Sequence, residues 1–475
     1  MCDQNRKDDQ QRTPLVDALH KQLGRVSFHM PGHRQGRIFP RLQADSALTL
    51  DTTELDRTGD LAQAEGHILD AYQLAARFFG AGRTWFITSG TTTSIFIMMA
   101  TALQEGDKVI LPRALHLAAV HAVAILGLEP VFVSPREGQV FPDGQPDEAA
   151  YLETIRQHPQ ARACLVTRPD YYGRTLDLKP LAQRCRQSDM ALLVDEAHGA
   201  HFAAAHELLP DTALSQGADM TCQSGHKTLP ALTPASLLHL SQDALDRGLL
   251  DLQRLAGMVK VFQTSSPSFL IAASLDEARA ALATRGLAAI RRLIQLNQAL
   301  ADGLPEGYQR ILPPGADPAR LVLDYSRTGL TRQAFARALD QAGIDAELVD
   351  LTRLVLIPGL DQDQADYDRL ALALQSIGQA GEGIDLEEHL VLLQARTLER
   401  DRFLSAPAAF LASPRQALLG RIEGKRPVVR AALAPYPPGL PILWPGEEMT
   451  PGHRAYLENL QSQGIHVRGL EEALL

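Results

Sequence analysis

The chain alternates short apolar segments with longer segments whose apolar residues recur every three to four positions. The short segments are rich in Val, Ile, Leu and Phe and end in polar turns, as buried strands do. The expected strands are residues 84–88, 108–111, 130–133, 163–167 and 191–195. The expected helices are residues 66–79, 92–104, 117–126, 151–158 and 178–188. This order predicts the α/β class, with a mostly parallel sheet that is covered by helices on both faces.

The pattern changes after Pro305 and again at a Gly-rich stretch near residue 380. We therefore expect four parts, namely an N-terminal arm (1–45), a large domain (46–305), a small α+β domain (306–380) and a C-terminal domain (384–475). Ligands of mostly parallel sheets bind at the carboxyl ends of the strands. The chemistry is accordingly expected at the strand ends of the large domain.

Composition narrows the class of protein. The 475 residues carry a net charge of −10 and contain no Lys/Arg cluster, which argues against nucleic-acid binding. The N-terminal residues lack the apolar core of a secretion signal, and no apolar stretch is long enough to cross a membrane. The four cysteines (Cys2, Cys164, Cys185 and Cys222) form no CxxC motif, which favours a reducing compartment. We expect a cytoplasmic protein without nucleic-acid or membrane partners.

Asp195 and Lys227 form the pair that points to a chemistry. Asp195 ends the expected strand 191–195, and Lys227 lies in the turn Ser-Gly-His-Lys-Thr-Leu-Pro of residues 224–230. A lysine amine forms a Schiff base with pyridoxal 5'-phosphate (PLP), and a carboxylate keeps the pyridine nitrogen protonated so that the ring accepts electrons. Separately, the two residues are typical of a surface lysine and a helix cap. Together they predict a PLP site.

The cofactor phosphate also has candidate ligands. Ser89, Gly90 and Thr91 join a strand to a helix, and hydroxyls with free N–H groups at a helix N-terminus bind anions. Ser224 and His226, in the turn before Lys227, are expected to add donors to the same phosphate.

Two histidines are expected beside the cofactor ring. His116 follows a strand end, where a flat side chain can stack on the pyridine, although a packed histidine is the alternative. His198 follows Asp195 by three positions and faces the same site. A metal site is not expected from the further residues His201 and His206, because only His198 should share the side of Asp195.

These motifs resemble the Orn/Lys/Arg decarboxylases, a family of PLP-dependent enzymes of fold type I, over nearly the whole chain. The shared motifs are Phe28-His29-Met30-Pro31-Gly32-His33, Asp51-Thr52-Thr53-Glu54-Leu55, Tyr171-Tyr172-Gly173, Asp195-Glu196-Ala197-His198-Gly199, residues 224–233, Thr264-Ser265-Ser266-Pro267-Ser268, and the Tyr-Pro-Pro-Gly-x-Pro and Pro-Gly-Glu motifs of residues 436–447. Length and domain order resemble the shorter, Bacillus-type branch, which has no N-terminal wing domain. The resemblance implies an aspartate aminotransferase-like large domain.

The resemblance also implies roles for single residues. Lys227 is then the Schiff-base lysine, Asp195 the partner of the pyridine nitrogen, and His116 and His198 the residues beside the ring, with the phosphate held by the residues named above. Thr264 and Ser265 match a segment that reaches the cofactor of the neighbouring subunit. We therefore expect a homodimer, or a higher homo-oligomer, with shared active sites.

Several positions differ from the family pattern. They are Ser89 where Asn is usual, Ile95-Phe96 where Gly-Asn is usual, Leu117-Ala118 where Lys or Ser is common, Asp170 where Thr is usual and Pro234 where Gln is usual. None removes a cofactor contact, so PLP binding is still expected, whereas the substrate side can differ.

The reaction that the resemblance implies is α-decarboxylation of lysine, arginine or ornithine to the corresponding amine, as in polyamine biosynthesis. Glu447 and the loop around Glu54 are the candidates for binding the distal cation of the substrate. Three alternatives stay open. They are an aminotransferase that uses Arg327 or Arg353 to bind the α-carboxylate, a retro-aldol lyase, and a catalytically silent regulatory paralogue.

Overall fold

The structure is a computed structural model that describes residues 26–28, 59–134, 145–379, 385–405, 408–420, 428–436 and 439–470. The motif residues 29–33 and 51–55, which include the candidate Glu54, lie outside the described residues, as do Pro437 and Pro438.

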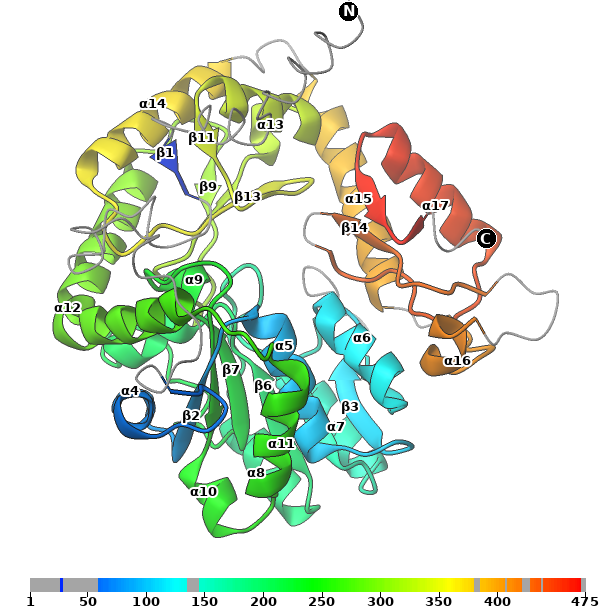
Figure 1. Ribbon diagram of the computed structural model, residues 1–475. Helices are drawn as coiled ribbons and strands as arrows, with labels where there is room; N and C mark the ends of the chain where they lie inside the picture. The colour runs from blue at the N-terminus through cyan, green and yellow to red at the C-terminus, as the bar shows by residue number, and fades with distance from the viewer. Residues whose placement is uncertain are drawn as a thin grey trace, which may run out of the picture.

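A seven-stranded sheet forms the centre of the molecule, in the order β2-β8-β7-β6-β5-β3-β4 (Figure 1). Its strands are β2 (Arg83–Ile87), β3 (Lys108–Pro112), β4 (Glu129–Val133), β5 (Ala163–Thr167), β6 (Ala191–Asp195), β7 (Met220–Ser224) and β8 (Ser236–Leu240). All neighbours pair in parallel except β8, which is antiparallel to both β2 and β7. The predicted α/β class is confirmed.

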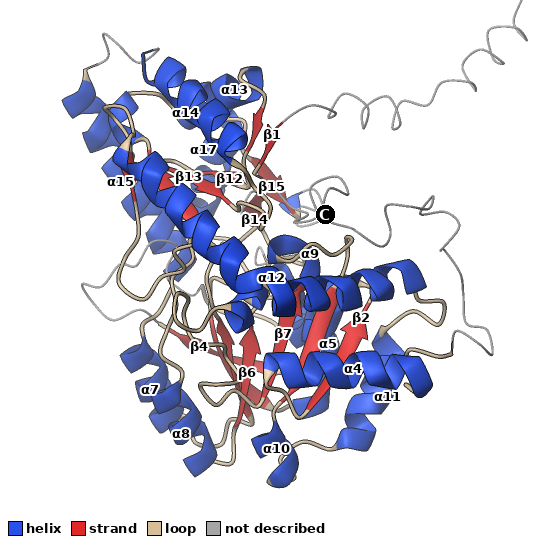
Figure 2. Ribbon diagram, turned by 90° about the vertical axis from the view of Figure 1, so that its left-hand side faces the viewer, coloured by secondary structure: helices blue, strands red, loops and turns tan. Residues whose placement is uncertain are grey.

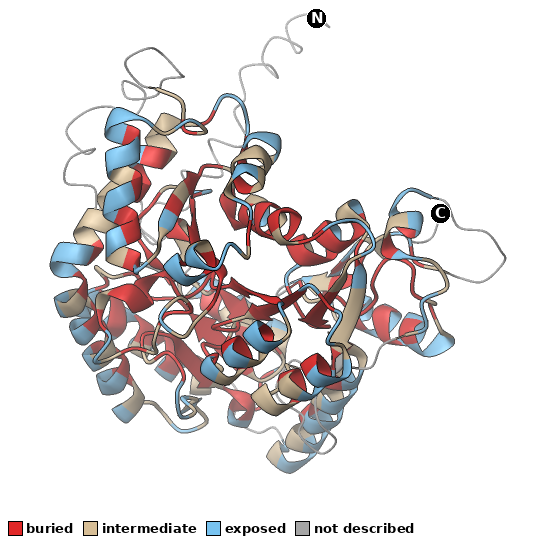
Figure 3. Ribbon diagram, turned by 90° about the horizontal axis from the view of Figure 1, so that it is seen from below, coloured by how far each residue is buried: buried red, intermediate tan, exposed pale blue. Residues whose placement is uncertain are grey.

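Helices cover both faces of this sheet because successive strand residues point to opposite sides. Leu193 packs with one face, whereas Leu192 and Val194 pack with the other. The first face is covered by α5 (Gly90–Ala102), α6 (Leu117–Leu126) and α11 (Leu252–Phe262). The second face is covered by α4 (Gly66–Phe79), α7 (Glu148–Gln157), α8 (Lys179–Gln187) and the long α12 (Phe269–Asp302), and Figure 2 shows α4 and α12 lying across it. Figure 3 shows that the strands are buried while the outer sides of the helices are exposed.

Short elements connect the remaining parts of this large unit. They are α9 (Gly225–Thr228), α10 (Gln242–Asp246) and the 3-10 helix η2 (Ala200–Ala204). Since α9 follows β7 directly, it holds Lys227 at the carboxyl edge of the sheet.

The small unit is built on a second, antiparallel sheet in the order β12-β13-β10-β9. Its elements are β9 (Gln309–Arg310), β10 (Leu321–Asp324), η3 (Ser326–Thr328), α13 (Arg332–Gln341), β11 (Ile344–Asp345), β12 (Leu348–Val349), β13 (Arg353–Leu356) and α14 (Gln364–Gln379). The N-terminal strand β1 (Val26–Ser27) pairs in parallel with β11, and the buried Phe28 packs into the core of this unit.

The C-terminal unit contains α15 (Leu386–Ser405), α16 (Pro414–Leu418), β14 (Ala434–Tyr436), α17 (Pro451–Ser462) and β15 (His466–Arg468). β14 and β15 pair antiparallel, and α17 packs beside them (Figure 1). The unit contacts the large unit where the ring of Trp444 meets that of Phe132, with centroids 5.0 Å apart. None of the helices in the described ranges is long and apolar enough to cross a membrane.

Candidate active site

Asp195 ends the central strand β6 and is buried, with 5% of its surface exposed. The backbone N–H of Ala197 donates to its Oδ1 at 3.1 Å. Burial raises the pKa of Asp195, while the positive charge of Lys227 and this hydrogen bond act in the opposite direction. A buried carboxylate therefore faces the lysine from the neighbouring strand.

Lys227 lies in α9, the helical turn that follows β7. Its Nζ is 2.9 Å from Nε2 of His198, and Nδ1 of the same ring is 3.2 Å from Nη2 of Arg320. Removal from water lowers the pKa of Lys227, and the charges of Glu347 and Asp195 oppose that shift. The structure thus brings together Asp195, His198 and Lys227, as predicted from the sequence.

His116 is the N-cap of α6, and its Nδ1 accepts a hydrogen bond from the N–H of Ala118 at 3.1 Å. The residue keeps accessible surface, although the protein atoms around it partly desolvate the ring. This desolvation, followed by the positive charge of Lys227, lowers the pKa of His116 to about 4. The ring is neutral at neutral pH, which suits a flat stacking surface.

The Ser89–Thr91 turn leaves two polar atoms without partners. Gly90 begins α5 with φ +85°, and a Cβ at this position would lie 3.2 Å from Cβ of Pro234. The hydroxyls of Ser89 and Thr91 are buried and have no hydrogen-bond partner within the described part of the chain. Buried polar atoms are normally hydrogen-bonded, so this turn fits a ligand that brings acceptor oxygens.

Ser224 and His226 lie beside that turn. Oγ of Ser224 is 3.1 Å from Nδ1 of His226, which also accepts from the N–H of Ala235 at 3.2 Å. Because Pro234 packs against Gly90 and precedes Ala235, the two predicted phosphate-binding segments meet at one edge of the sheet.

Thr264 and Ser265 lie at the surface, shortly after α11. Both are exposed, and Thr264 Oγ1 accepts from the N–H of Ser266 at 3.3 Å and lies 3.4 Å from Oγ of the same residue. The preceding Gln263 is buried, and its Oε1 accepts from the N–H of Thr88 at 3.0 Å. This bond anchors the segment beside the Ser89–Thr91 turn with its two hydroxyls at the surface.

The expectation that Glu447 binds the substrate is wrong. Glu447 is fully buried, and its two carboxylate oxygens are bound by Arg113, with Oε2 2.6 Å from Nη2. The N–H of Trp444 donates to Oε2 as well, at 2.7 Å. Glu447 therefore fastens the C-terminal unit to the loop after β3.

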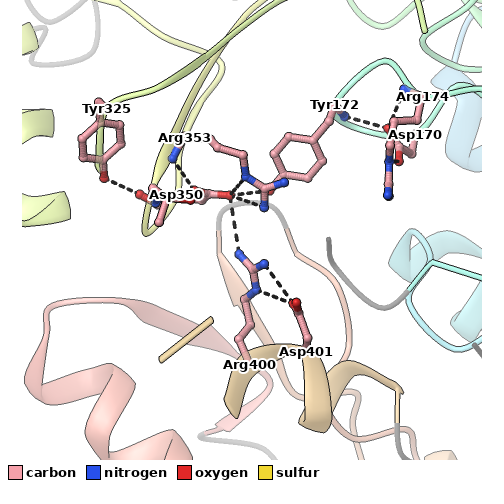
Figure 4. Close-up of polar contacts among 9 residues, drawn as sticks. Asp170, Tyr172, Arg174, Tyr325, Asp350, Arg353, Arg400 and Asp401 are labelled. Atoms are coloured by element: carbon pink, nitrogen blue, oxygen red, sulfur yellow. Dashed lines mark hydrogen bonds and ion pairs between the residues drawn. The ribbon is translucent and has the colours of Figure 1, made fainter. Parts of the chain in front are cut away.

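The two arginines considered for an aminotransferase differ in their surroundings. Arg353 is buried, forms an ion pair of 2.8 Å with Asp350, and lies over the ring of Tyr172 at 3.7 Å from its centroid (Figure 4). Arg400 of the C-terminal unit approaches the same Asp350 oxygen at 3.5 Å. Arg327 is exposed in η3. The guanidinium of Arg353 is thus bound within the contact between the three units.

Further histidines of the sequence have other roles in the structure. Nε2 of His201 is 3.0 Å from Oδ2 of Asp317, and both residues are buried. His206 is exposed.

Sequence reasoning missed Glu347 and Arg320 of the small unit. Glu347 has 8% of its surface exposed and accepts a hydrogen bond from Tyr171 at 3.0 Å. The ring of Tyr171 lies 5.0 Å from that of His198. The Tyr171-Tyr172-Gly173 motif was the available signal, but it did not indicate which distant residues it would contact.

Known proteins resemble this chain closely enough to establish its family. Residues 13–305 match the family model of the Orn/Lys/Arg decarboxylase major domain. The arginine decarboxylase of Bacillus subtilis is 32% identical over 98% of this chain and 97% of its own length, and that of Bacillus anthracis is 30% identical over 98% and 96%.

Solved structures agree on the fold. The constitutive lysine decarboxylase of E. coli superposes with a TM-score of 0.73 at 20% identity, covering 89% of this chain and 73% of its own. An alanine–glyoxylate aminotransferase from Nostoc superposes with a TM-score of 0.56 at 19% identity, over 74% of this chain and 95% of its own. The predicted fold type is therefore confirmed, and the chain belongs to the Orn/Lys/Arg decarboxylase family.

Proposed function

We propose that this protein is a PLP-dependent decarboxylase of a basic L-amino acid, with arginine as the first substrate to test. The observation that carries the proposal is the position of Lys227 beside His198 and Asp195 in a chain of this family. The Bacillus relatives at 30 and 32% identity are named arginine decarboxylases, whereas a Pseudomonas relative named lysine decarboxylase is 23% identical, which favours arginine.

The residues present fit PLP. Ser89 and Thr91 offer buried hydroxyls beside a helix N-terminus, Lys227 offers an amine, and Asp195 offers a buried carboxylate. When bound, PLP supplies an electron sink for the bond broken at the substrate Cα.

The side chains then have separate tasks. Asp195 holds a proton on the pyridine nitrogen, because a buried carboxylate gains most from a cationic partner. His116 would offer a neutral imidazole to the ring, and Ser224 and His226 would hold the phosphate together with Gly90. Lys227 or His198 delivers a proton to the substrate Cα after CO2 leaves.

We assign the distal cation of the substrate to Glu347 in place of Glu447. Glu347 accepts a hydrogen bond from Tyr171, whose ring lies 5.0 Å from that of His198, and its negative charge raises the pKa of Lys227. The hydroxyl of Tyr171 holds one of its oxygens at 3.0 Å, which orients the carboxylate. A guanidinium donates to a carboxylate through two parallel N–H groups, which favours arginine at such a position.

Decarboxylation is favoured over transamination because Arg353 is tied to Asp350 and Tyr172. An aminotransferase binds the α-carboxylate through an arginine, whereas a decarboxylase benefits when that carboxylate is poorly solvated, since its charge is lost in the transition state.

We also propose a cytoplasmic homodimer with shared sites. The exposed hydroxyls of Thr264 and Ser265, anchored beside the Ser89–Thr91 turn, support a contact with a second subunit. The described cysteines, Cys164, Cys185 and Cys222, are buried free thiols, as is usual in a reducing compartment.

The test is incubation of the purified protein and PLP with arginine, lysine, ornithine and norleucine, with CO2 and amine measured by mass spectrometry. We expect amine and CO2 from a basic substrate and little from norleucine, which lacks the distal cation. A keto acid as the main product, or equal turnover of norleucine, would contradict the proposal.

The role of Glu347 has its own test. Glu347→Gln removes a charged hydrogen bond worth about 1.5–3 kcal/mol, so kcat/KM for the basic substrate should fall roughly tenfold to a hundredfold. Glu306→Gln, which alters an exposed glutamate of the same unit, is the matched control and should leave kcat/KM unchanged. Unchanged kinetics in Glu347→Gln would remove Glu347 from the site.

A further inference from the structure

His198 bridges the lysine to an arginine of the small unit. Nε2 of its ring is 2.9 Å from Nζ of Lys227, and Nδ1 is 3.2 Å from Nη2 of Arg320. His198 and Arg320 lie in the interior between the large and small units, 5% and 3% exposed, whereas Lys227 is half-buried. The imidazole therefore has one defined neighbour at each nitrogen.

The hydrogen-bonding groups of these three side chains determine which of their nitrogen atoms carry a proton. A guanidinium has only N–H donors, so Nδ1 of His198 must accept from Arg320. A neutral imidazole whose Nδ1 accepts carries its single proton on Nε2. That N–H points at Nζ of Lys227, which must accept it through a lone pair. A protonated Lys227 has no lone pair, so the contact requires the neutral amine.

The doubly protonated state of His198 does not fit this arrangement. It would place an N–H of the imidazolium against the N–H of Arg320 and add a second positive charge beside that of the guanidinium. Burial, followed by the charges of Lys227 and Arg320, holds the pKa of His198 well below its usual range. Electrostatics and hydrogen-bond geometry thus agree on a neutral ring.

We propose that Arg320 is a positioning residue that selects the Nε2–H tautomer of His198 and thereby holds Lys227 as the neutral, nucleophilic amine. The inference deepens the proposed function, because it takes Lys227 to be the amine that reacts with PLP. A lysine attacks a carbonyl carbon only through its unprotonated form. The hydrogen bond from His198 therefore favours the reactive form of Lys227 whenever Nζ is not bonded to the cofactor.

The other charged and titratable groups around Lys227 divide into two sets. Asp195 and Glu347 favour the protonated amine, since both raise its pKa. Burial, the largest effect, and Arg320 lower that pKa. His116 is neutral at neutral pH, Cys222 is a neutral thiol because burial raises its pKa, and His226 faces the pair from α9. Two anions thus oppose the neutral amine, and the hydrogen bond from His198 works against them.

Arg320 is itself held by the large unit. Its Nη1 donates to the carbonyl of Tyr171 at 3.3 Å, and its Cβ lies 3.0 Å from where a Cβ on Gly173 would be. The nearby Asp317 binds His201 at 3.0 Å and donates its N–H to the carbonyl of Gly173 at 2.8 Å. The arginine reaches His198 only while the small unit is docked on these segments, so docking and the state of the lysine are coupled.

The direct test is the tautomer of His198 in the wild-type, full-length protein freed of cofactor. Selective ¹⁵N labelling of histidine and long-range ¹H–¹⁵N spectra distinguish the two ring nitrogens, and the His198 signals are assigned by their loss in His198→Gln. We expect a proton on Nε2 alone. A proton on Nδ1, or on both nitrogens, at neutral pH would overturn the proposal, and this measurement needs no Arg320 variant to fold.

Variants of Arg320 test the consequence for the lysine. In the cofactor-free protein, the pH dependence of Lys227 acylation is measured by mass spectrometry against the exposed Lys260. Arg320→Met should raise the midpoint for Lys227 by about one pH unit, which means roughly tenfold less neutral amine at a given lower pH. Arg320→Lys retains a positive charge and one donor group, so partial recovery is expected.

The matched control is Arg310→Gln. Arg310 donates to the carbonyl of Pro318 at 2.9 Å, close to Arg320 in the chain, but does not contact His198. In Arg310→Gln, the pH midpoint of Lys227 acylation should equal that of the wild type. An unchanged midpoint in a folded Arg320→Met protein would contradict the proposal. Failure of the proposed function would show differently, as a cofactor bound elsewhere than Lys227 while the tautomer result stands.

Discussion

The ion pair between Arg113 and Glu447 is the contact whose loss should have the clearest structural effect. Arg113 follows β3 and is 2% exposed, and Glu447 in the C-terminal unit is completely buried. Nη2 of Arg113 also donates to the carbonyl of Ile442 at 2.7 Å, and Nε1 of Trp444 donates to the carbonyl of Arg113 at 3.3 Å. The perturbation is Glu447→Gln, which keeps the shape of the side chain and removes its charge.

The magnitude follows from the burial of both partners. Breaking a buried pair costs about 3–5 kcal/mol, because one charge is left without compensation. The glutamine oxygen still accepts one hydrogen bond from Arg113, so we expect the lower end, about 3 kcal/mol. That value corresponds to a roughly hundredfold larger population of molecules in which the C-terminal unit has opened.

Native-state hydrogen exchange followed by mass spectrometry measures this opening region by region. Amides of β14 and β15 should exchange roughly a hundredfold faster in Glu447→Gln, whereas those of the central strand β6 should be unaffected. Glu448→Gln, which changes the neighbouring carboxylate, is the matched control and should exchange as the wild type does.

A double variant separates the buried charge from the shape of the contact. Arg113→Met combined with Glu447→Leu leaves no buried charge, and apolar replacements of buried pairs are often neutral. It should therefore recover most of the protection that Glu447→Gln loses. Either of two results would contradict the role assigned to this ion pair. One is exchange in Glu447→Gln within a factor of about two of wild type, and the other is a double variant as unprotected as the single one.

Three further predictions concern the site. Reduction of the cofactor-loaded protein with borohydride should fix PLP to one peptide that contains Lys227, and a labelled peptide without Lys227 would end the central assignment. Asp195→Asn should keep PLP but lose about 3 kcal/mol of transition-state stabilisation, roughly a hundredfold in kcat, and near-normal turnover would exclude its role. Mixing Lys227→Ala chains with chains altered at both Thr264 and Ser265 should restore part of the activity through mixed dimers. No recovery, with a monomeric mass in solution, would rule out shared sites.

The large unit could be predicted because its signals are local. The predicted strand of residues 191–195 coincides with β6, and the predicted helix of residues 66–79 coincides with α4. A buried strand or an amphipathic helix can be recognised within a short segment, from a run of apolar residues or from apolar residues repeated every three to four positions. The antiparallel direction of β8 was not predicted, since the apolar run of residues 229–240 carries no mark of strand direction.

Asp195 and His198 could be placed from the sequence because they end or follow an apolar strand, and the carboxyl edge of a parallel sheet collects such residues regardless of distant contacts. Lys227 was identified from its Ser-Gly-His-Lys motif, whereas the strand β7 before it was not predicted. The partners that come from other units could not be predicted from the sequence and are known from the folded structure. Glu447 proved to be bound by Arg113, 334 positions away, and docking of the small unit brings Arg320 to His198 and Glu347 to Tyr171. Such contacts depend on how separately folded surfaces meet, and that is set by packing over the whole interface, which no short stretch of sequence encodes.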